Sequence, residues 1–247
     1  ESRQRTLAAG GIMLFILAGG LFGRLRYVRK TKKIIEKERD RSENLLLNIL
    51  PAELAKELKE KGAADAQLVD QATVIFTDFK GFTTMSEQLS PQELVADLHA
   101  CFSEFDQICE KYGIEKIKTI GDAYMAAGGL PTPNQTHPID VVKAALEMVE
   151  VVKRVKAVKR AADLPFFEVR IGIHTGPVVA GIVGVKKFQY DIWGDTVNTA
   201  SRMESSGEVR KVNISQVTYE LLKSECDLVF EARGKVVVKG KGEMKMY

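Results

Sequence analysis

The sequence has few cysteines and a low net charge, and each of these features argues against a class of protein. The 247 residues include three cysteines, an odd number, without the spacing of a zinc site or a redox pair. The sequence therefore argues against a disulfide framework and favours a reducing cytoplasm. The formal net charge is only +3, and the basic residues gather in residues 24–33. This distribution indicates a local anionic surface rather than a nucleic-acid partner.

The chain also lacks a methionine at its first position. It begins at Glu1, and an apolar run follows almost at once. We therefore expect the natural protein to carry a further N-terminal region, with a sensor role, ahead of this chain.

The apolar run extends from Thr6 to Gly23 between Arg5 and Arg24. At about 1.5 Å per residue, a helix of this length just crosses a hydrocarbon core of roughly 30 Å. A signal-peptide core and a buried soluble helix are the alternatives, but basic residues follow the run where a signal peptide would have a cleavage site. We predict a transmembrane helix with a basic cytoplasmic flank over residues 1–27, which places the rest of the chain on the cytoplasmic side of the inner cell membrane.

Residues 28–65 are predicted to form a linker helix that resembles a coiled coil. Pro51 is expected to break the helix, and Gly62 to close the linker. Residues with heptad spacing form a seam along this helix, and some of them are polar. The polar residues favour a coupling helix that changes register, and a marginal coiled coil explains them equally well. The seam comprises Val28, Thr31, Ile35, Glu38, Ser42, Leu45 and Ile49.

Residues 66–247 show the patterns of an α+β domain. Apolar and β-branched runs predict strands, and amphipathic stretches between them predict helices. The order β-α-β-β-α-β predicts a ferredoxin-like sheet with extra elements. The expected strands cover residues 71–79, 114–120, 123–129, 167–174, 178–183 and 187–192, and the expected helices cover residues 90–112, 138–160 and 195–205.

Two aspartates stand where predicted strands end. Asp78 precedes a turn that contains Gly81, and Asp122 lies in a hairpin turn. Each alone is readily explained as a turn former. Together, two carboxylates and a glycine turn with free backbone N–H groups match the needs of Mg²⁺ and a phosphate substrate.

Four blocks of the sequence closely resemble the class III adenylyl/guanylyl cyclase family. They are FTDFKGFT at 76–83, EKIKTIGDAYMAAGGL at 115–130, RIGIHTGPVVAGIVG at 170–184 and QYDIWGDTVNTASRME at 189–204. The resemblance covers about residues 46–247 and excludes the predicted membrane helix. It implies a cyclase catalytic domain that converts ATP to cyclic AMP and pyrophosphate.

The resemblance also implies the metal site. Asp78, Asp122 and the main-chain carbonyl of Phe79 would hold two Mg²⁺ or Mn²⁺ ions, and the ribose 3′-oxygen would attack the α-phosphorus in line. The turn formed by Phe79, Gly81, Phe82 and Thr83 would contact the substrate.

Lys118 and Asp191 match the positions that recognise the base in this family. A lysine offers only donors and an ionised aspartate only acceptors, which fits the N1 acceptor and the amino donor of adenine. Guanine would be mismatched at both contacts, and the matching residues of guanylyl cyclases are typically Glu and Cys. Without the surrounding motif, Lys118 would be a solvated strand lysine and Asp191 a turn residue.

Asn198 and Arg202 lie four residues apart on a predicted helix and so project from one face. The resemblance assigns Asn198 to the ribose and Arg202 to the negative charge of the transition state, although an ordinary helix asparagine and surface arginine would look the same. Lys239 is expected to contact the triphosphate, with Lys241 as the alternative, both on one side of a strand-like VKGKG.

The resemblance implies a site shared between two catalytic domains. Because this chain carries both halves of the site, a homodimer with two equivalent sites is expected.

Three other functions compete with that of an adenylyl cyclase. A regulatory nucleotide-binding module would usually have lost a metal carboxylate or the arginine, and both are present. A diguanylate cyclase carries a Gly-Gly-Asp/Glu-Glu-Phe turn, whereas the turn here is Ile-Gly-Asp-Ala-Tyr. A pure dimerisation protein would not need Lys118 and Asp191.

Overall fold

The computed structural model describes residues 2–184 and 188–247, with side chains described from residue 19 onward. The chain divides into two compact units, Glu1–Lys56 and Glu57–Tyr247. Each unit is described by itself.

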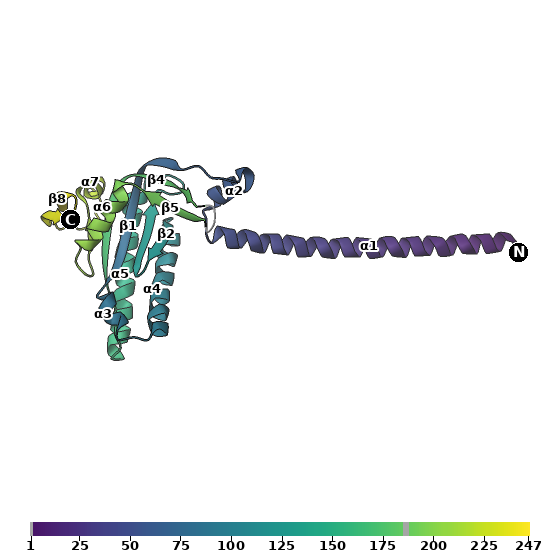
Figure 1. Ribbon diagram of the computed structural model, residues 1–247, viewed down its shortest axis with the longest axis horizontal. Helices are drawn as coiled ribbons and strands as arrows, with labels where there is room; N and C mark the ends of the chain where they lie inside the picture. Colours follow the sequence, from purple (N-terminus) through teal and green to yellow (C-terminus); the bar gives the residue numbers. More distant parts are fainter. Residues whose placement is uncertain (1, 185–187) are drawn as a thin grey trace. The chain divides into compact units, whose positions relative to one another are not determined.

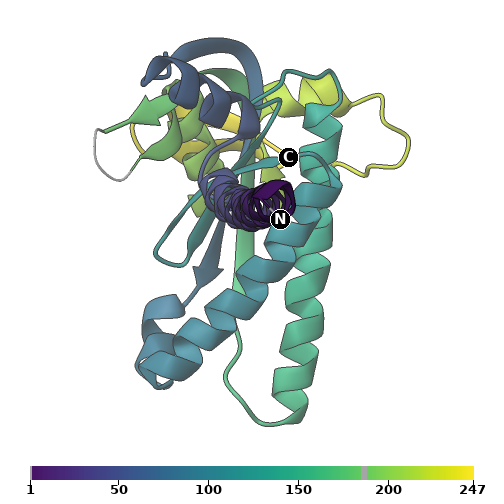
Figure 2. The same cartoon turned by 90° about the vertical axis from the view of Figure 1, so that its right-hand side faces the viewer.

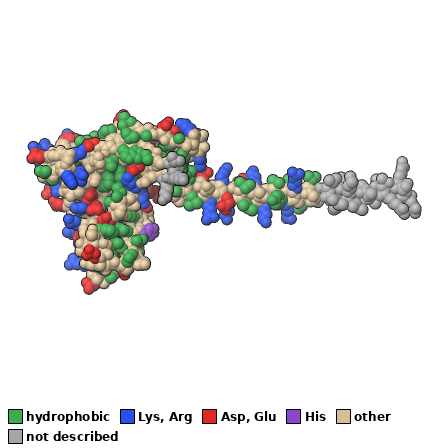
Figure 3. Space-filling model, viewed as in Figure 1, with side chains coloured by type: hydrophobic (Ala, Val, Ile, Leu, Met, Phe, Trp, Pro, Cys, Tyr) green, Lys and Arg blue, Asp and Glu red, His purple; other side chains and the backbone are tan. Residues whose placement is uncertain are grey.

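Helix α1 (Ser2–Leu47) forms most of the first unit, and α2 (Ala52–Lys61) follows it. The predicted break at Pro51 is confirmed, since proline cannot continue the helix through its missing N–H. Lysine and arginine side chains stand along the described part of α1 (Figure 3). Most of the predicted membrane span, residues 6–18, lies outside the residues whose side chains are described. Among the described residues, the structure contains no helix that is both long and apolar enough to span a bilayer.

A six-stranded sheet forms the centre of the second unit (Figure 1). Five strands follow the order β2-β3-β1-β4-β5 with antiparallel neighbours, and β6 pairs in parallel with β4. The segment β2-β3-β1-β4 is the ferredoxin-like order, so the predicted α+β cyclase fold is confirmed for this unit. The strands are β1 (Gln67–Lys80), β2 (Glu115–Ile120), β3 (Ala123–Gly128), β4 (Glu168–Val183), β5 (Gln189–Trp193) and β6 (Val212–Ile214).

Helices α4 (Pro91–Lys111) and α5 (His137–Ala161) lie side by side and cover one face of the sheet (Figure 2). A capping box starts α4, in which Ser90 Oγ accepts from the Glu93 N–H and Glu93 Oε2 accepts from the Ser90 N–H at 2.9 Å. Strand residues of one parity, such as Ile75 and Ile171, are buried against these helices. Residues of the other parity therefore face away from α4 and α5.

Helix α6 (Asp195–Ser205) packs against β1 and β4 on that opposite face. The helix backbone approaches Gly172 of β4 so closely that a β-carbon there would lie 1.8 Å from the backbone nitrogen of Glu204. Only glycine allows this contact.

Three sequence predictions differ from the structure. Strand β4 is continuous, although the sequence predicts two strands on either side of Pro177. The proline has no paired residue in the β1–β4 ladder, because the register shifts between Val69 and Ala72 of β1 at this point. The turn after β1 continues into a short helix, α3 (Phe82–Ser86). Sequence patterns also did not predict β6 and α7 (Gln216–Leu222).

The prediction that Lys239 and Lys241 alternate along a strand is wrong. Strands β7 (Gly234–Val238) and β8 (Gly242–Met246) pair as a hairpin, and the two lysines lie in its turn. Gly240 has a φ of 79° in this turn, a conformation that glycine adopts without strain.

The buried cysteines have no special environment. Cys101 and Cys109 are packed as small apolar residues on the α4 side of the core, and burial raises the pKa of each thiol to about 11. Thiols with such a pKa are poor nucleophiles at neutral pH.

Candidate active site

The structure brings Asp78 and Asp122 together at one end of the sheet. Asp78 lies near the end of β1, and Asp122 lies in the turn between β2 and β3, beside β1 because β3 pairs with β1 up to Thr77 and Tyr124. Partial burial raises the pKa of Asp122, and the charge of the neighbouring Asp78 raises it further. Two carboxylates that repel each other in this way favour a bound cation between them.

Two charged residues that the motif analysis did not select join this pair. Arg170 lies directly opposite Asp78 in the β1–β4 ladder, and its Nη2 donates to Asp78 Oδ2 at 2.8 Å. Its Nε lies 2.9 Å from Oε1 of Glu204 on α6. Burial raises the pKa of Glu204 to about 7, against the opposing effect of Arg170. The strand register was the signal for Arg170, and sequence alone does not give a register.

The donor set around Asp78 fits a divalent cation that also needs phosphate ligands. Among the described residues, no group of three or more His, Cys, Asp or Glu side chains is placed to hold a metal ion by itself. Mg²⁺ commonly takes only one or two carboxylates from the protein and completes its shell with water and substrate phosphates. Asp78 and Asp122 supply those two carboxylates.

The turn after Asp78 is anchored by aromatic packing. The Phe79 ring is buried, and its centroid lies 5.0 Å from that of the Phe167 ring. The centroid of the Phe82 ring lies 5.9 Å from that of the same Phe167 ring. Phe79 is buried and offers only its main chain to a ligand, whereas Phe82 is half-buried and its contact with the substrate stays a prediction. Gly81 has a φ of 77° and open space around it, and Thr83 is exposed. The backbone of this turn is accessible.

Lys118 and Asp191 form an ion pair, with Nζ 2.5 Å from Oδ2. They come from β2 and β5, which are far apart in the strand order but in contact in space. The Lys118 side chain is 28 % exposed and that of Asp191 is 14 % exposed, so both are reachable from solvent yet largely enclosed. One donor and one acceptor thus lie side by side, and their role in recognising the base stays a prediction.

Helix α6 presents functional residues on two opposite faces. Met203 and Glu204 are buried against the sheet, whereas Asn198 is exposed and Arg202 is half-buried. Residues that lie two positions apart on a helix are separated by about 200° around its axis, so Arg202 points away from the side that carries Glu204. Asn198 and Arg202 therefore do not converge with the Asp78 cluster of their own chain.

The two turn lysines differ in their partners. Lys241 pairs with Asp195 in the first turn of α6. Lys239 is exposed at the tip of the hairpin. Lys239 is therefore the better placed of the two to reach a ligand outside its own chain.

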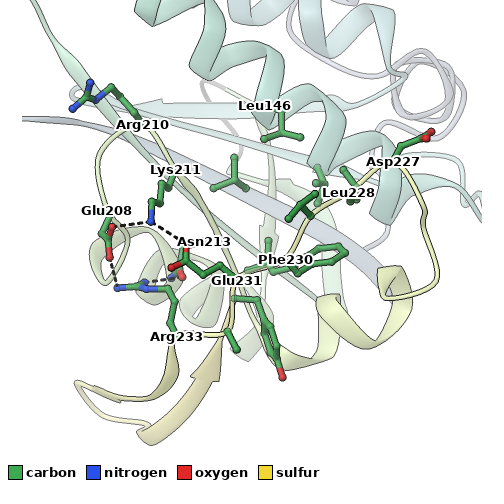
Figure 4. A pocket seen from close by; sticks show the side chains of 16 residues that line it. Leu146, Glu208, Arg210, Lys211, Asn213, Asp227, Leu228, Phe230, Glu231 and Arg233 are labelled. Carbon is green, nitrogen blue, oxygen red and sulfur yellow. Dashed lines mark hydrogen bonds and ion pairs between the residues drawn. The ribbon is translucent and has the colours of Figure 1, made fainter.

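A pocket of about 670 Å³ lies apart from these residues, beside β6 and the 227–233 segment (Figure 4). None of the predicted site residues lines it. Its cations are already paired, with Lys211 Nζ 3.3 Å from Glu208 Oε2 and Arg233 Nη1 donating to Asn213 Oδ1 at 2.8 Å. The contacts of this pocket are structural and do not identify it as the active site.

Known proteins resemble most of the chain. A family model described as "Adenylate and Guanylate cyclase catalytic domain" matches residues 64–247. An adenylate cyclase of Mycobacterium tuberculosis is 42% identical over 224 residues, which are 90% of this chain and 49% of that protein. Human guanylyl cyclase C is 40% identical over 222 residues, 89% of this chain and 20% of that protein. The chain thus spans about half the length of the mycobacterial relative.

Solved structures agree with these similarities. The catalytic core of a rhodopsin-guanylyl cyclase with converted specificity, in complex with ATPalphaS, is 36% identical, with a TM-score of 0.67 over 74% of this chain and 96% of that one. The adenylyl cyclase CyaB from P. aeruginosa is 31% identical, with a TM-score of 0.69 over 74% and 94% of the two chains. Because the family model covers all the site residues described above, the chain belongs to the adenylate and guanylate cyclase catalytic domain family.

Proposed function

We propose that this chain is an adenylyl cyclase that converts ATP to 3′,5′-cyclic AMP and pyrophosphate. Family membership supports a nucleotide cyclase, but relatives of both base specificities are similarly close. The observation that carries the choice of ATP is the ion pair between Lys118 and Asp191. Its adjacent donor and acceptor complement N1 and the exocyclic amine of adenine, while guanine would leave both of these largely enclosed groups unpaired.

Asp78, Asp122 and the main-chain carbonyl of Phe79 would hold two Mg²⁺ or Mn²⁺ ions. When bound, these ions supply the positive charge that lowers the pKa of the ribose 3′-hydroxyl and neutralises the triphosphate. The turn at Gly81, with Phe82 and Thr83 at its end, offers backbone N–H groups to phosphate oxygens. Burial and then the charge of Asp78 raise the pKa of Asp122, and this supports the role, because a bound cation would offset both costs of the charged carboxylate.

The remaining residues act on the nucleotide from the other side. Asn198 orients the ribose, so that the 3′-oxygen stands in line with the bond between the α-phosphorus and the leaving pyrophosphate. Arg202 donates to the oxygens that gain charge as the new bond forms and the old one breaks. Lys239 contacts the triphosphate.

Each active site is proposed to form between two copies of the chain. The opposite directions of Glu204 and Arg202 on α6 support this arrangement, since a nucleotide held by Asp78 in one chain cannot also reach the outward face of that chain's α6. A two-fold dimer provides two equivalent sites from the same pair of surfaces.

Attachment to the inner cell membrane through residues 1–27 remains part of the proposal, supported by the apolar run of residues 6–23 and its basic flank. The expected result is that the chain sediments with membranes and is released by detergent but not by high salt. Release by salt alone would contradict a spanning helix.

The catalytic proposal is tested with the purified chain, Mn²⁺ and equimolar ATP and GTP, with the products separated by chromatography. We expect cyclic AMP as the main product, and its loss in Asp78→Asn and in Asp122→Asn. Asp227→Asn is the matched control, because this exposed aspartate undergoes the same change away from the site. Cyclic GMP as the main product would refute the base assignment, and activity retained in either site variant would refute the metal assignment.

A further inference from the structure

The guanidinium of Arg170 is shared between two carboxylates from different elements. Its Nη2 contacts Asp78 on the neighbouring strand at 2.8 Å, and its Nε lies 2.9 Å from Glu204 on α6. The Arg170 side chain is 18 % exposed and that of Glu204 is 10 % exposed. Both contacts are therefore largely shielded from solvent, where opposite charges attract more strongly than at the surface. The contact with Asp78 is a hydrogen bond, and the contact with Glu204 is an ion pair.

Glu204 is held in place by its surroundings. The glycine at position 172 lets the backbone of Glu204 lie directly on β4. Arg233 Nη1 donates to Asn213 Oδ1 (Figure 4). It also donates to the carbonyl of Ser206, and Asn213 Nδ2 donates to the carbonyl of Met203 at 2.7 Å. The end of α6 is thus fixed on both sides of Glu204.

The charges around Arg170 are unbalanced. The carboxylates of Asp78, Asp122 and Glu204 influence one another, and Arg170 is the cation paired with two of them. A cation bound by Asp78 and Asp122 would compete with Arg170 for Asp78. The contact with Glu204 lies on the Nε edge, so it persists when the Nη groups are displaced.

We propose that Glu204 is a positioning residue, which holds Arg170 by its Nε edge while the Nη groups exchange Asp78 for the triphosphate of the bound nucleotide. The inference rests on the proposed function, because it requires a nucleoside triphosphate at the Asp78 site. Without Glu204, a guanidinium displaced from Asp78 has no fixed direction, and part of its contact with the phosphates is lost.

The test measures binding rather than turnover. The full chain is titrated with 3′-deoxy-ATP in Mn²⁺, because this nucleotide lacks the attacking hydroxyl and cannot cyclise. We expect Glu204→Gln to raise the Kd about tenfold, because glutamine keeps an oxygen of the same size but lacks the negative charge that holds the guanidinium in the ion pair. Binding of 3′-deoxy-AMP should change less than twofold, because that ligand lacks the phosphates that Arg170 would contact. Glu220→Gln, an exposed glutamate on α7, is the matched control.

A double-mutant cycle separates positioning from a merely structural role. In an Arg170→Met chain, adding Glu204→Gln should raise the Kd no further, because Glu204 acts through Arg170. Glu204→Asp, which keeps the charge but is one methylene shorter, should give an intermediate Kd, and it replaces Glu204→Gln if that variant does not fold.

The proposal is overturned if Glu204→Gln lowers the thermal midpoint of unfolding but binds 3′-deoxy-ATP like the wild type, or if the effects of the two substitutions multiply. If the wild type does not bind the triphosphate at all, the proposed function fails as well. Tight binding by the wild type with no effect of Glu204→Gln refutes the positioning role alone.

Discussion

Two inactive variants of this chain should restore each other if the active site is shared between two copies. Asp78→Ala removes a carboxylate from one half of the site, and Arg202→Ala removes a cation from the other half. Because Arg202 projects from α6 away from the Asp78 cluster of its own chain, the two substitutions affect different halves of any one site. In a mixed dimer, one site then carries both lesions and the other carries neither.

The geometry fixes the expected size of the effect. Each mixed dimer keeps one intact site of its two, so its turnover should be about half that of the wild-type dimer. The two chains are coexpressed with different tags and purified in sequence, so that only mixed dimers remain. Cyclic AMP formation is then measured at saturating ATP and Mn²⁺.

The matched control is a mixed dimer of Asp78→Ala with Asp122→Ala. Both substitutions lie in the same half of the site, so every site in this dimer lacks one carboxylate and activity should stay absent. Activity no higher than the average of the two parent variants in the Asp78→Ala/Arg202→Ala dimer would refute the shared site. Recovery in the control dimer would refute the assignment of the two aspartates to one half.

Three further outcomes are expected. Burial lowers the pKa of His174 to about 4 in the folded chain. Its contribution to the free energy of unfolding, about 3 kcal/mol, is therefore fully present above the ordinary histidine pKa near 6.5 and is lost as the pH falls through 4. Urea unfolding between pH 7 and pH 4 should show this loss, and His174→Gln should flatten the curve; parallel curves would contradict it. Gly172→Ala should destabilise the fold by at least about 2 kcal/mol, because the new β-carbon meets the backbone of α6, and a wild-type thermal midpoint would show that the contact is looser. Lys118→Glu combined with Asp191→Cys should shift the ratio of kcat/KM for ATP and GTP toward GTP; an unchanged ratio would show that this pair does not read the base.

Local sequence signals were sufficient where a function depends on neighbours along the chain. Asp78 and Asp122 were predicted because one precedes a turn and the other lies in a turn with a short-range signature, and because the surrounding sequence blocks resemble the cyclase family. The predicted bounds of α6 agree with the structure, so the common face of Asn198 and Arg202 follows from helical periodicity. The roles of these residues remain predictions.

Contacts between distant segments required the tertiary structure. The pairing of Arg170 with Asp78 depends on the register of β1 against β4, which is set by the packing of whole strand faces rather than by either segment alone. The approach of Glu204 to Arg170 depends on Gly172, a residue whose importance is visible only once α6 is packed against it.

The two carboxylates of the proposed metal site, Asp78 and Asp122, could therefore be predicted from the sequence. The residues that surround them, Arg170 and Glu204, were decided by the fold. Turn and helix signals act over a few residues, so they are readable in a single chain. Lys239 shows the limit of such signals, since its position at a hairpin tip depends on the pairing of β7 with β8. Arg170 on β4 balances the charge of Asp78, and Glu204 on α6 contacts that arginine; only burial of the two sheet faces brings these elements together.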